Sequence, residues 1–316
     1  MIALAPKRQV VERWPQLPLA AWEPTYRTLH LWTQILGKTR LVLSPMQNHW
    51  WHAALYVSTR GLTTSPMPCG DRLIEIELDL IGHRLIATSE GATESFPLVA
   101  MSVADFYRQY VQLLRSIDVH VAIRTVPSEV ADQTRFEDDR HHASYDADAA
   151  HRAWQALAQS ARVLAGFRGR FLGKSSPVHF WWGGFDLACT RFSGRPAPVH
   201  PGGVPYIPDR VVREAYSHEC ASVGWWPGVG AGDVREPAVL EPAFYAYAAP
   251  QPPGYANAAI APSAAYYHPT MFEWILPYEA VRTAADPDRT LLEFCESTYA
   301  AAATLGAWDR AALERG

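Results

Sequence analysis

Apolar residues recur at helical three- and four-residue steps in two long stretches of the chain. In the first stretch, residues 19–36, the apolar positions are Trp22, Tyr26, Leu29, Trp32 and Ile35. In the second stretch, residues 147–172, they are Trp154, Leu157, Ala161, Leu164 and Phe167. This spacing places the apolar side chains on one face of a helix, so both stretches are predicted to be helices that face the core.

Other hydrophobic patterns predict antiparallel strands after each of these helices. Residues 73–80 alternate charged and apolar positions, as a half-buried strand does, and residues 83–88 are expected to return beside them. The other runs that we predict to be strands are 96–101, 216–226, 244–248 and 272–276. Two further helices are predicted over residues 103–117, with Ser102 as the N-cap, and over residues 287–305.

These elements predict an α+β fold with two similar halves. Each half has a helix, several antiparallel strands and a second helix, and the two sheets would either join or pack face to face. We place the halves at residues 1–140 and 141–316, with the boundary in the polar segment 126–144. The two halves are expected to form one compact unit.

A weak internal repeat supports this division, although chance similarity is the alternative. The shared strings are Leu-Gly-Lys, Trp-Trp and Thr-Arg, at 36–38, 50–51 and 59–60 in one copy and at 172–174, 181–182 and 190–191 in the other. Gly37 and Gly173 are interpreted as left-handed residues that close the preceding helices. A phosphate-binding loop is excluded, because the glycine that it needs five residues earlier is replaced by Trp32 and Arg168.

Composition narrows the classes of protein that the chain can belong to. The chain has 316 residues, of which 48% are hydrophobic and 19% charged, a globular composition with enough length for a sizeable core. A net charge of -4 gives no basic field for nucleic acid. No apolar run reaches the roughly 18 residues of a membrane span, so no membrane partner is expected.

Cysteine usage and the start of the chain indicate a cytoplasmic protein. The four cysteines, Cys69, Cys189, Cys220 and Cys295, are scattered and form no C-x-x-C pair, so we interpret them as reduced thiols. The first 16 residues lack the layout of a secretory signal, in which a charged segment precedes an apolar one.

The candidate catalytic residues are His179, His218 and Glu219. All three lie in predicted strands of the C-terminal half, and neighbouring strands could bring them onto one face. A histidine beside a carboxylate can transfer protons near neutral pH, and two histidines with a carboxylate could instead hold a metal. The alternative is that both are hydrogen-bonded core histidines. The sequence identifies no cofactor and does not decide whether a metal is bound.

The candidate ligand-binding residues are arginines and tryptophans. Arg191, Arg195 and the repeat-equivalent Arg60 have guanidinium groups that suit a carboxylate or phosphate. The tryptophans expected to form apolar walls are Trp181, Trp182, Trp225 and Trp226. The alternative is that the arginines pair with internal carboxylates, such as Asp186 or those at 137–139.

A second histidine pair, His49 and His52, flanks the first tryptophan doublet. On a strand these residues would face opposite sides, as one packed and one surface histidine, whereas in a bent loop they could converge on a metal.

Two functions remain open from the residues alone. The first is binding of a small, anionic molecule between the halves or under the proline-rich loops at 195–209 and 250–269, with or without hydrolytic or proton-transfer catalysis. The second is a non-catalytic interaction or oligomerisation protein in which the histidines and arginines are structural. The oligomeric state is not determined by the sequence.

Four long strings of the chain resemble a known family. They are WPQLPLAAWEPTYRTLHLWTQILGKTRL, NHWWHAALYVSTRGLTT, GKSSPVHFWWGGFDLACTRFSGRPAP and YSHECASVGWWPG. They look like a bacterial family of uncharacterised proteins that is catalogued only as a domain of unknown function. The resemblance extends from about Trp14 to Trp308 and implies a single full-length unit. It implies no activity, cofactor or catalytic residue.

Overall fold

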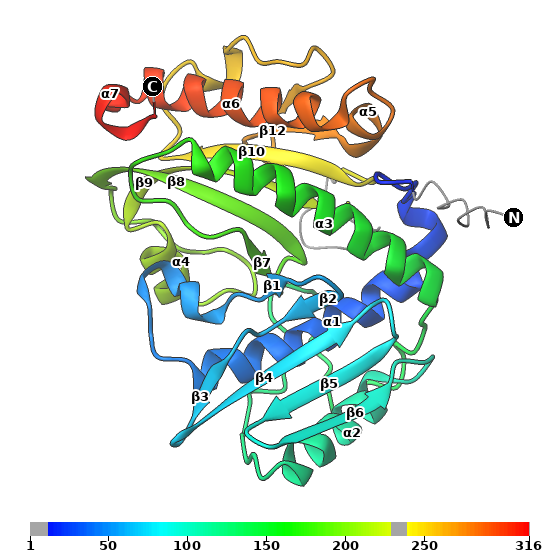
Figure 1. Ribbon diagram of the computed structural model, residues 1–316. Helices are drawn as coiled ribbons and strands as arrows, with labels where there is room; N and C mark the ends of the chain where they lie inside the picture. The colour runs from blue at the N-terminus through cyan, green and yellow to red at the C-terminus, as the bar shows by residue number, and fades with distance from the viewer. Residues whose placement is uncertain (1–11, 229–238, 316) are drawn as a thin grey trace, which may run out of the picture.

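The computed structural model describes residues 12–228 and 239–315, and it has an α+β fold with two six-stranded antiparallel sheets. Figure 1 shows the N-terminal sheet in the lower part of the molecule and the C-terminal sheet in the upper part. The N-terminal sheet has the order β1-β2-β4-β5-β6, and β3 pairs with β4. The C-terminal sheet has the order β11-β12-β10-β9-β8-β7.

Most of these strands are connected as meanders. The N-terminal strands are β1 (Tyr56–Val57), β2 (Gly61–Thr63), β3 (Met67–Cys69), β4 (Arg72–Asp79), β5 (Arg84–Ser89) and β6 (Ala92–Pro97). The C-terminal strands are β7 (His179–Trp181), β8 (Asp186–Pro196), β9 (His218–Trp226), β10 (Ala243–Ala249), β11 (Tyr266–His268) and β12 (Glu273–Pro277).

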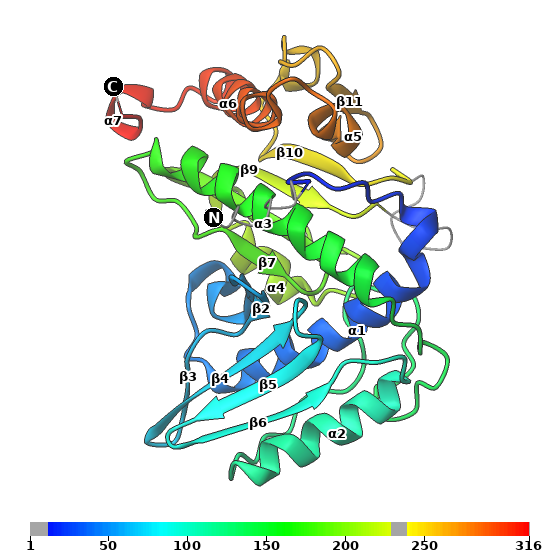
Figure 2. The same cartoon turned by 45° about the vertical axis from the view of Figure 1, so that its right-hand side comes forward.

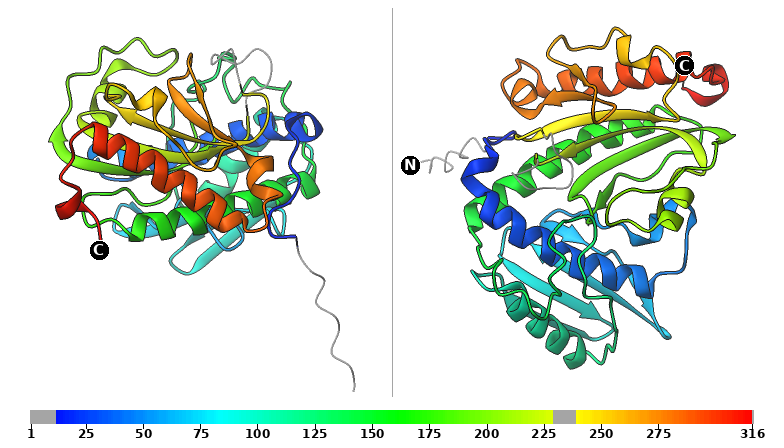
Figure 3. Two further views of the ribbon diagram at one scale, coloured as in Figure 1. Left: turned by 90° about the horizontal axis from the view of Figure 1, so that it is seen from above. Right: turned by 180° about the vertical axis from the view of Figure 1, so that it is seen from behind.

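Two helices cover one face of each sheet. The N-terminal sheet packs against α1 (Leu19–Leu43) and α2 (Val103–Ser116), where the ring of Trp32 stacks 4.5 Å from that of Phe106. The C-terminal sheet packs against α3 (Ala147–Gly169) and α6 (Pro287–Leu305), which lie on the same side of it (Figure 3, left). Figure 2 shows α2 alongside β6, at the edge of the molecule farthest from α6.

The remaining helices are short. They are η1 (Asn48–Ala53), α4 (Asp209–Ala215), η2 (Tyr255–Asn257), α5 (Tyr278–Arg282) and α7 (Arg310–Leu313). The short helices α4 and η1 contact each other on the side of the C-terminal sheet that α3 and α6 leave uncovered (Figure 1).

Strand β8 shows how the two faces of the C-terminal sheet differ. Successive strand residues point to opposite faces. Leu187, Cys189 and Arg191 therefore face α3 and α6, whereas Asp186 and Thr190 face α4 and η1. The helix side carries the main hydrophobic core, and the other side carries the polar groups of a cleft.

Within the described part of the chain, the two sheets join at a single backbone pair. Leu55, just before β1, and Phe180 in β7 exchange two hydrogen bonds with N···O distances of 2.9 and 2.8 Å. One continuous cluster of buried side chains extends from Trp14 to Ala303 and includes residues of both halves. The two halves therefore share one hydrophobic core, and the Leu55–Phe180 backbone pair forms the seam between their sheets.

The predicted fold class is confirmed, and several predicted elements match closely. Helix α6 has the predicted bounds, 287–305. The Ser102 hydroxyl accepts a hydrogen bond from the Asp105 amide at 3.1 Å, as an N-cap does. The predicted strands at 73–80, 83–88 and 216–226 correspond to β4, β5 and β9.

The interpretation of Gly37 and Gly173 as left-handed helix ends is wrong, and of the two alternatives for the segment around the first tryptophan doublet the structure has no strand. Helix α1 continues to Leu43, so Gly37 lies inside it, and neither Gly37 nor Gly173 has a positive φ. Gly37 is needed for a close approach: a Cβ atom there would lie 2.0 Å from the Trp182 indole. The first tryptophan doublet lies in η1 and not in a strand, with His49 and Trp50 in left-handed conformations at φ 57° and 62°.

The repeated strings occupy different local structures. Lys38 lies inside α1 whereas Lys174 follows α3, and Arg60 lies in a turn whereas Arg191 lies in the middle of β8. The duplication itself therefore stays a prediction. Within residues 12–228 and 239–315, no helix is both long enough and apolar enough to cross a lipid bilayer.

Candidate functional site

A cleft lies between the two halves, next to the seam at Leu55 and Phe180. It has two chambers with the shared wall residues Trp50, Glu129, Trp181, Ile207 and Val211. The loop chamber, about 510 Å³, lies between α1, η1 and the segments 124–133 and 206–211. The sheet chamber, about 230 Å³, lies between η1, α4 and the uncovered face of the C-terminal sheet. The larger volume is within the range of small-molecule sites.

The loop chamber is lined by three cations and one carboxylate. The cations are Lys38, Arg124 and Arg210, and the carboxylate is that of Glu129. The Arg210 guanidinium lies 5.5 Å from the centre of a Trp50 ring, which holds the charge over an aromatic face. The chamber therefore has a net positive lining.

Lys38 is the most buried of these charges. Its side chain projects from the C-terminal part of α1 and is 5% exposed, and its Nζ donates to the Ser128 hydroxyl at 3.0 Å. The Nζ lies 5.4 Å from the centre of a Trp182 ring. Burial, and secondarily the charge of Arg124, lower the pKa of Lys38 to about 8, while Glu129 acts in the opposite direction.

The sheet chamber has a floor of hydrogen-bonded polar side chains. Tyr245 donates to the Asp186 carboxylate at 2.5 Å, and the Tyr216 hydroxyl lies 3.2 Å from that of Tyr247. The Thr190 and Ser222 hydroxyls are 2.9 Å apart. Burial, and secondarily the charge of Asp186, raise the pKa of Tyr245 well above its ordinary value, so Tyr245 is a neutral donor.

His49 forms one wall of the sheet chamber and has a fixed tautomer. Its Nδ1 is 3.0 Å from the Ala215 carbonyl, which can only accept, so Nδ1 carries the proton. The Nε2 then accepts from Lys174 Nζ at 2.7 Å. Burial is the largest cause that lowers the pKa of His49, and Lys174 and His218 add to it. His49 is thus held neutral between two elements.

The structure does not gather the sequence-predicted catalytic residues in one cavity. His179 is 1% exposed, and neither ring nitrogen has a hydrogen-bond partner among residues 12–228 and 239–315. Across the sheet, His179 in β7 is aligned with Ala188 in β8 and with Gly224 in β9. His218 lies six residues before Gly224 in β9, and six strand residues span about 20 Å, so the two histidines are far apart. Both histidines belong to one chain of ring contacts, in which Trp51 and His49 lie between them.

Glu219 and Arg195 pair with each other outside the cleft. The Arg195 Nε donates to the Glu219 carboxylate at 2.8 Å. The same guanidinium donates to the Gly306 carbonyl at 2.6 Å and to the Ala307 carbonyl at 2.9 Å, at the end of α6. Here Arg195 satisfies carbonyls that a helix end leaves free.

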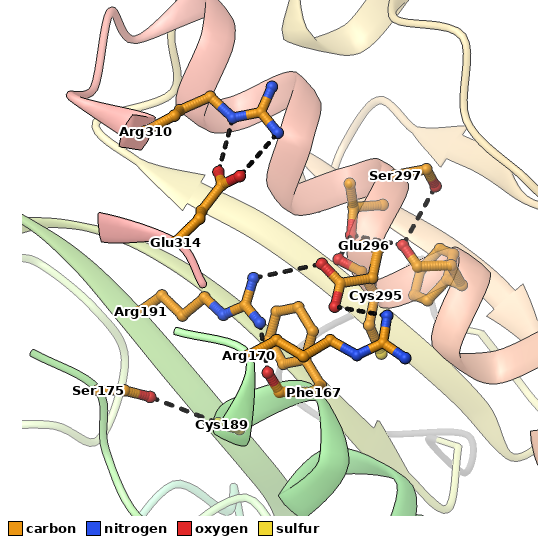
Figure 4. Close-up of polar contacts among 12 residues, drawn as sticks. Phe167, Arg170, Ser175, Cys189, Arg191, Cys295, Glu296, Ser297, Arg310 and Glu314 are labelled. Carbon is orange, nitrogen blue, oxygen red and sulfur yellow. Dashed lines mark hydrogen bonds and ion pairs between the residues drawn. The ribbon is translucent and has the colours of Figure 1, made fainter. Parts of the chain in front are cut away.

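Arg191 lies on the helix side of the C-terminal sheet, where Figure 4 shows it between α3 and α6. Its guanidinium is 3.4 Å from the ring centre of Phe167 and 4.3 Å from that of Tyr299. Its Nη1 lies 3.4 Å from the Glu296 carboxylate, and it also donates to the Phe167 carbonyl. Arg191 is thus a buried residue of the core, held by ring stacking, an ion pair and one backbone hydrogen bond.

The other predicted ligand-binding residues divide between the cleft and the rest of the molecule. Arg60 pairs with Asp79 in the N-terminal sheet, with an Nε–Oδ2 distance of 2.8 Å. Trp225 is buried in the main core and Trp226 in the small cluster around Tyr245. Trp181 and Trp182 are the two predicted wall residues that line the loop chamber.

His179→Phe is expected to flatten the acid dependence of stability. Burial holds the pKa of His179 near 3, with Arg40 and Arg168 contributing, whereas the unfolded residue titrates near 6.5. The unfolded state then binds more protons between these values, so the stability of the native protein falls as the pH falls. His179 accounts for a loss of about 2 kcal/mol in the free energy of unfolding between pH 7.5 and pH 5.

Urea unfolding at the two pH values measures this effect. His49 and His52 remain in both proteins, so the difference between wild type and variant isolates His179. Equal losses of stability on acidification in wild type and variant would contradict the assignment.

Sequence reasoning missed most of the residues that line the cleft. The missed residues are Lys38, Arg124, Glu129, Asp186, Arg210, Tyr245 and Tyr247. Lys38 was hidden because Gly37-Lys38 was interpreted as a helix end. Helix α4, with Arg210, lies between the proline-rich loop 195–209 and the predicted strand 216–226, where the sequence predicted no element. Among the described residues, no group of three or more His, Cys, Asp or Glu is placed to hold a metal ion.

Comparison with protein families matches the chain to a family model over nearly its whole length. The chain belongs to a family of unknown function, DUF5996, whose model matches residues 14–315. Neither the curated proteins nor the solved structures give a match to the chain.

Proposed function

We propose that this protein binds a small molecule with an anionic group on an aromatic or apolar body, in the loop chamber of the cleft. The observation that supports this is the lining of that chamber, in which Lys38, Arg124 and Arg210 outnumber the single carboxylate of Glu129 among tryptophan rings. Cationic groups in a confined site with low polarity attract an anion more strongly than they do in water. The tryptophans supply the apolar contact that most small-molecule sites have.

The sheet chamber extends the same site with neutral polar groups. Tyr245, Tyr247 and Ser222 present hydroxyls, and Asp186 presents a carboxylate that already accepts from Tyr245. We infer that this chamber takes the hydrogen-bonding end of the ligand and the loop chamber its charged end.

Calorimetric titration with phenyllactate, benzoate and phenyl phosphate, and with neutral benzyl alcohol, tests the proposal. At least one anion is expected to bind, and Arg210→Gln is expected to weaken its binding about tenfold, because one charge-assisted hydrogen bond is lost. The matched control is Arg213→Gln, on the same helix, whose guanidinium pairs with Asp209 at 3.2 Å. It should leave the affinity within about twofold.

The competing function is an interaction or oligomerisation surface. If none of the anions binds, or if benzyl alcohol binds as tightly as they do, the anion site is refuted. A stable oligomer in analytical ultracentrifugation, together with that result, would favour the competing function.

A further inference from the structure

Lysine is rare in this chain, and its positions are informative. Of 28 basic residues only Lys7, Lys38 and Lys174 are lysines. The other 25 basic residues are arginines, whose positive charge is permanent. Lys38 keeps an amine at a position that is 5% exposed and opens into the loop chamber. A lysine differs from an arginine there in that its amine can lose a proton and become a nucleophile.

The surroundings of Lys38 favour the neutral amine. The side chain is packed between aromatic rings, with Nζ 5.4 Å from the centre of a Trp182 ring and 5.9 Å from that of Phe136. Arg124, a second cation, lines the same chamber. An apolar pocket and a neighbouring cation are the two features that activate lysine nucleophiles.

We propose that Lys38 forms an imine with the carbonyl carbon of a 2-oxo acid bound in the loop chamber. This inference rests on the proposed function, because Arg124 and Arg210 would hold the carboxylate of that acid. The carbonyl carbon of a 2-oxo acid is next to its carboxylate, so one small ligand engages both the arginines and the lysine.

Glu129 is the group placed to move the protons. Its carboxylate lines the same chamber and lies against Gly183, where a Cβ atom would be 1.9 Å from Oε1. It takes a proton from the Lys38 ammonium, and the amine then attacks the carbonyl carbon. The carbonyl oxygen takes one proton back from Glu129 and one from the attacking nitrogen and leaves as water, which gives a protonated imine and no net change in oxidation state.

Reductive trapping tests this proposal. Wild-type protein is incubated with phenylpyruvate and sodium cyanoborohydride, and each lysine-containing peptide is quantified by mass spectrometry. Lys38 is expected to be modified at least about tenfold faster than the exposed Lys174, with a rate that rises as the pH approaches 8. Phenyllactate, which has no carbonyl group, should slow the modification of Lys38 by competition.

The outcomes separate this proposal from the proposed function. Modification of Lys174 or Lys7 as fast as Lys38 in the wild-type protein overturns the imine, and this comparison does not depend on any variant being folded. If phenyllactate still binds in calorimetry, the anion site stands without the imine.

Discussion

Gly37→Ala is expected to destabilise the protein by about 3 kcal/mol, although the same change usually stabilises a helix. The added Cβ would lie 2.0 Å from Cδ1 of Trp182 and 2.2 Å from its Nε1. The indole cannot move aside freely, because it is 8% exposed and its Nε1 donates to the Ala53 carbonyl at 2.7 Å. Either α1 shifts within the core or this hydrogen bond breaks.

Gly166→Ala is the matched control for this substitution. Gly166 lies in the interior of α3 and is exposed, and a Cβ there would meet nothing within 4 Å. This variant should gain about 0.5 to 1 kcal/mol. Urea unfolding of both variants measures the contrast, and a stabilised Gly37→Ala would show that Trp182 does not lie against α1 as described.

Arg191→Met is expected to cost about 3 kcal/mol of unfolding free energy, the second large effect. The substitution keeps an unbranched side chain but removes a guanidinium that is 1% exposed and stacked on Phe167 and Tyr299. It also leaves the Glu296 carboxylate and the Phe167 carbonyl without this donor. Because Glu296 is 31% exposed, water can hydrate its carboxylate in the variant. The expected loss of stability is therefore at the low end of the range for a broken buried ion pair.

Arg170→Met provides the comparison for Arg191→Met. Arg170 also pairs with Glu296, at 3.7 Å, but its side chain is 60% exposed, so its removal should change stability by less than about 0.5 kcal/mol. Thermal unfolding of the two variants separates the contribution of burial from that of the ion pair. Similar losses in both would mean that the stacking on Phe167 and Tyr299 contributes little.

The general fold could be predicted from the sequence because its signals are local. The alternation in residues 73–80 and the cap at Ser102 depend on neighbouring residues, and both are found in the structure. The end of α1 was missed for a non-local reason. Gly37 leaves room for the indole of Trp182, which is 145 positions away in the sequence. A contact between such distant residues leaves no local sequence pattern.

The cleft could be predicted only in part, because its loop chamber alone is formed by five segments from both halves. The Trp181-Trp182 doublet was visible as an aromatic signal. Lys38 carried a signal that was not used, since three lysines among 28 basic residues is an unusual proportion. Arg191 shows the opposite error, because an arginine next to aromatic residues has the same sequence signature in a core stack as in a binding pocket.

The position of Trp182 determines what happens when the protein is divided into two fragments. Trp182 comes from the C-terminal half, yet it rests on α1 of the N-terminal half and lines a chamber with Lys38. A fragment that starts after residue 140 would lack Lys38, Trp50 and Glu129, and a fragment that stops there would lack Trp181, Trp182 and Arg210. Co-expression of the two fragments as separate chains would recover ligand binding only if they reassociate along the Leu55–Phe180 seam.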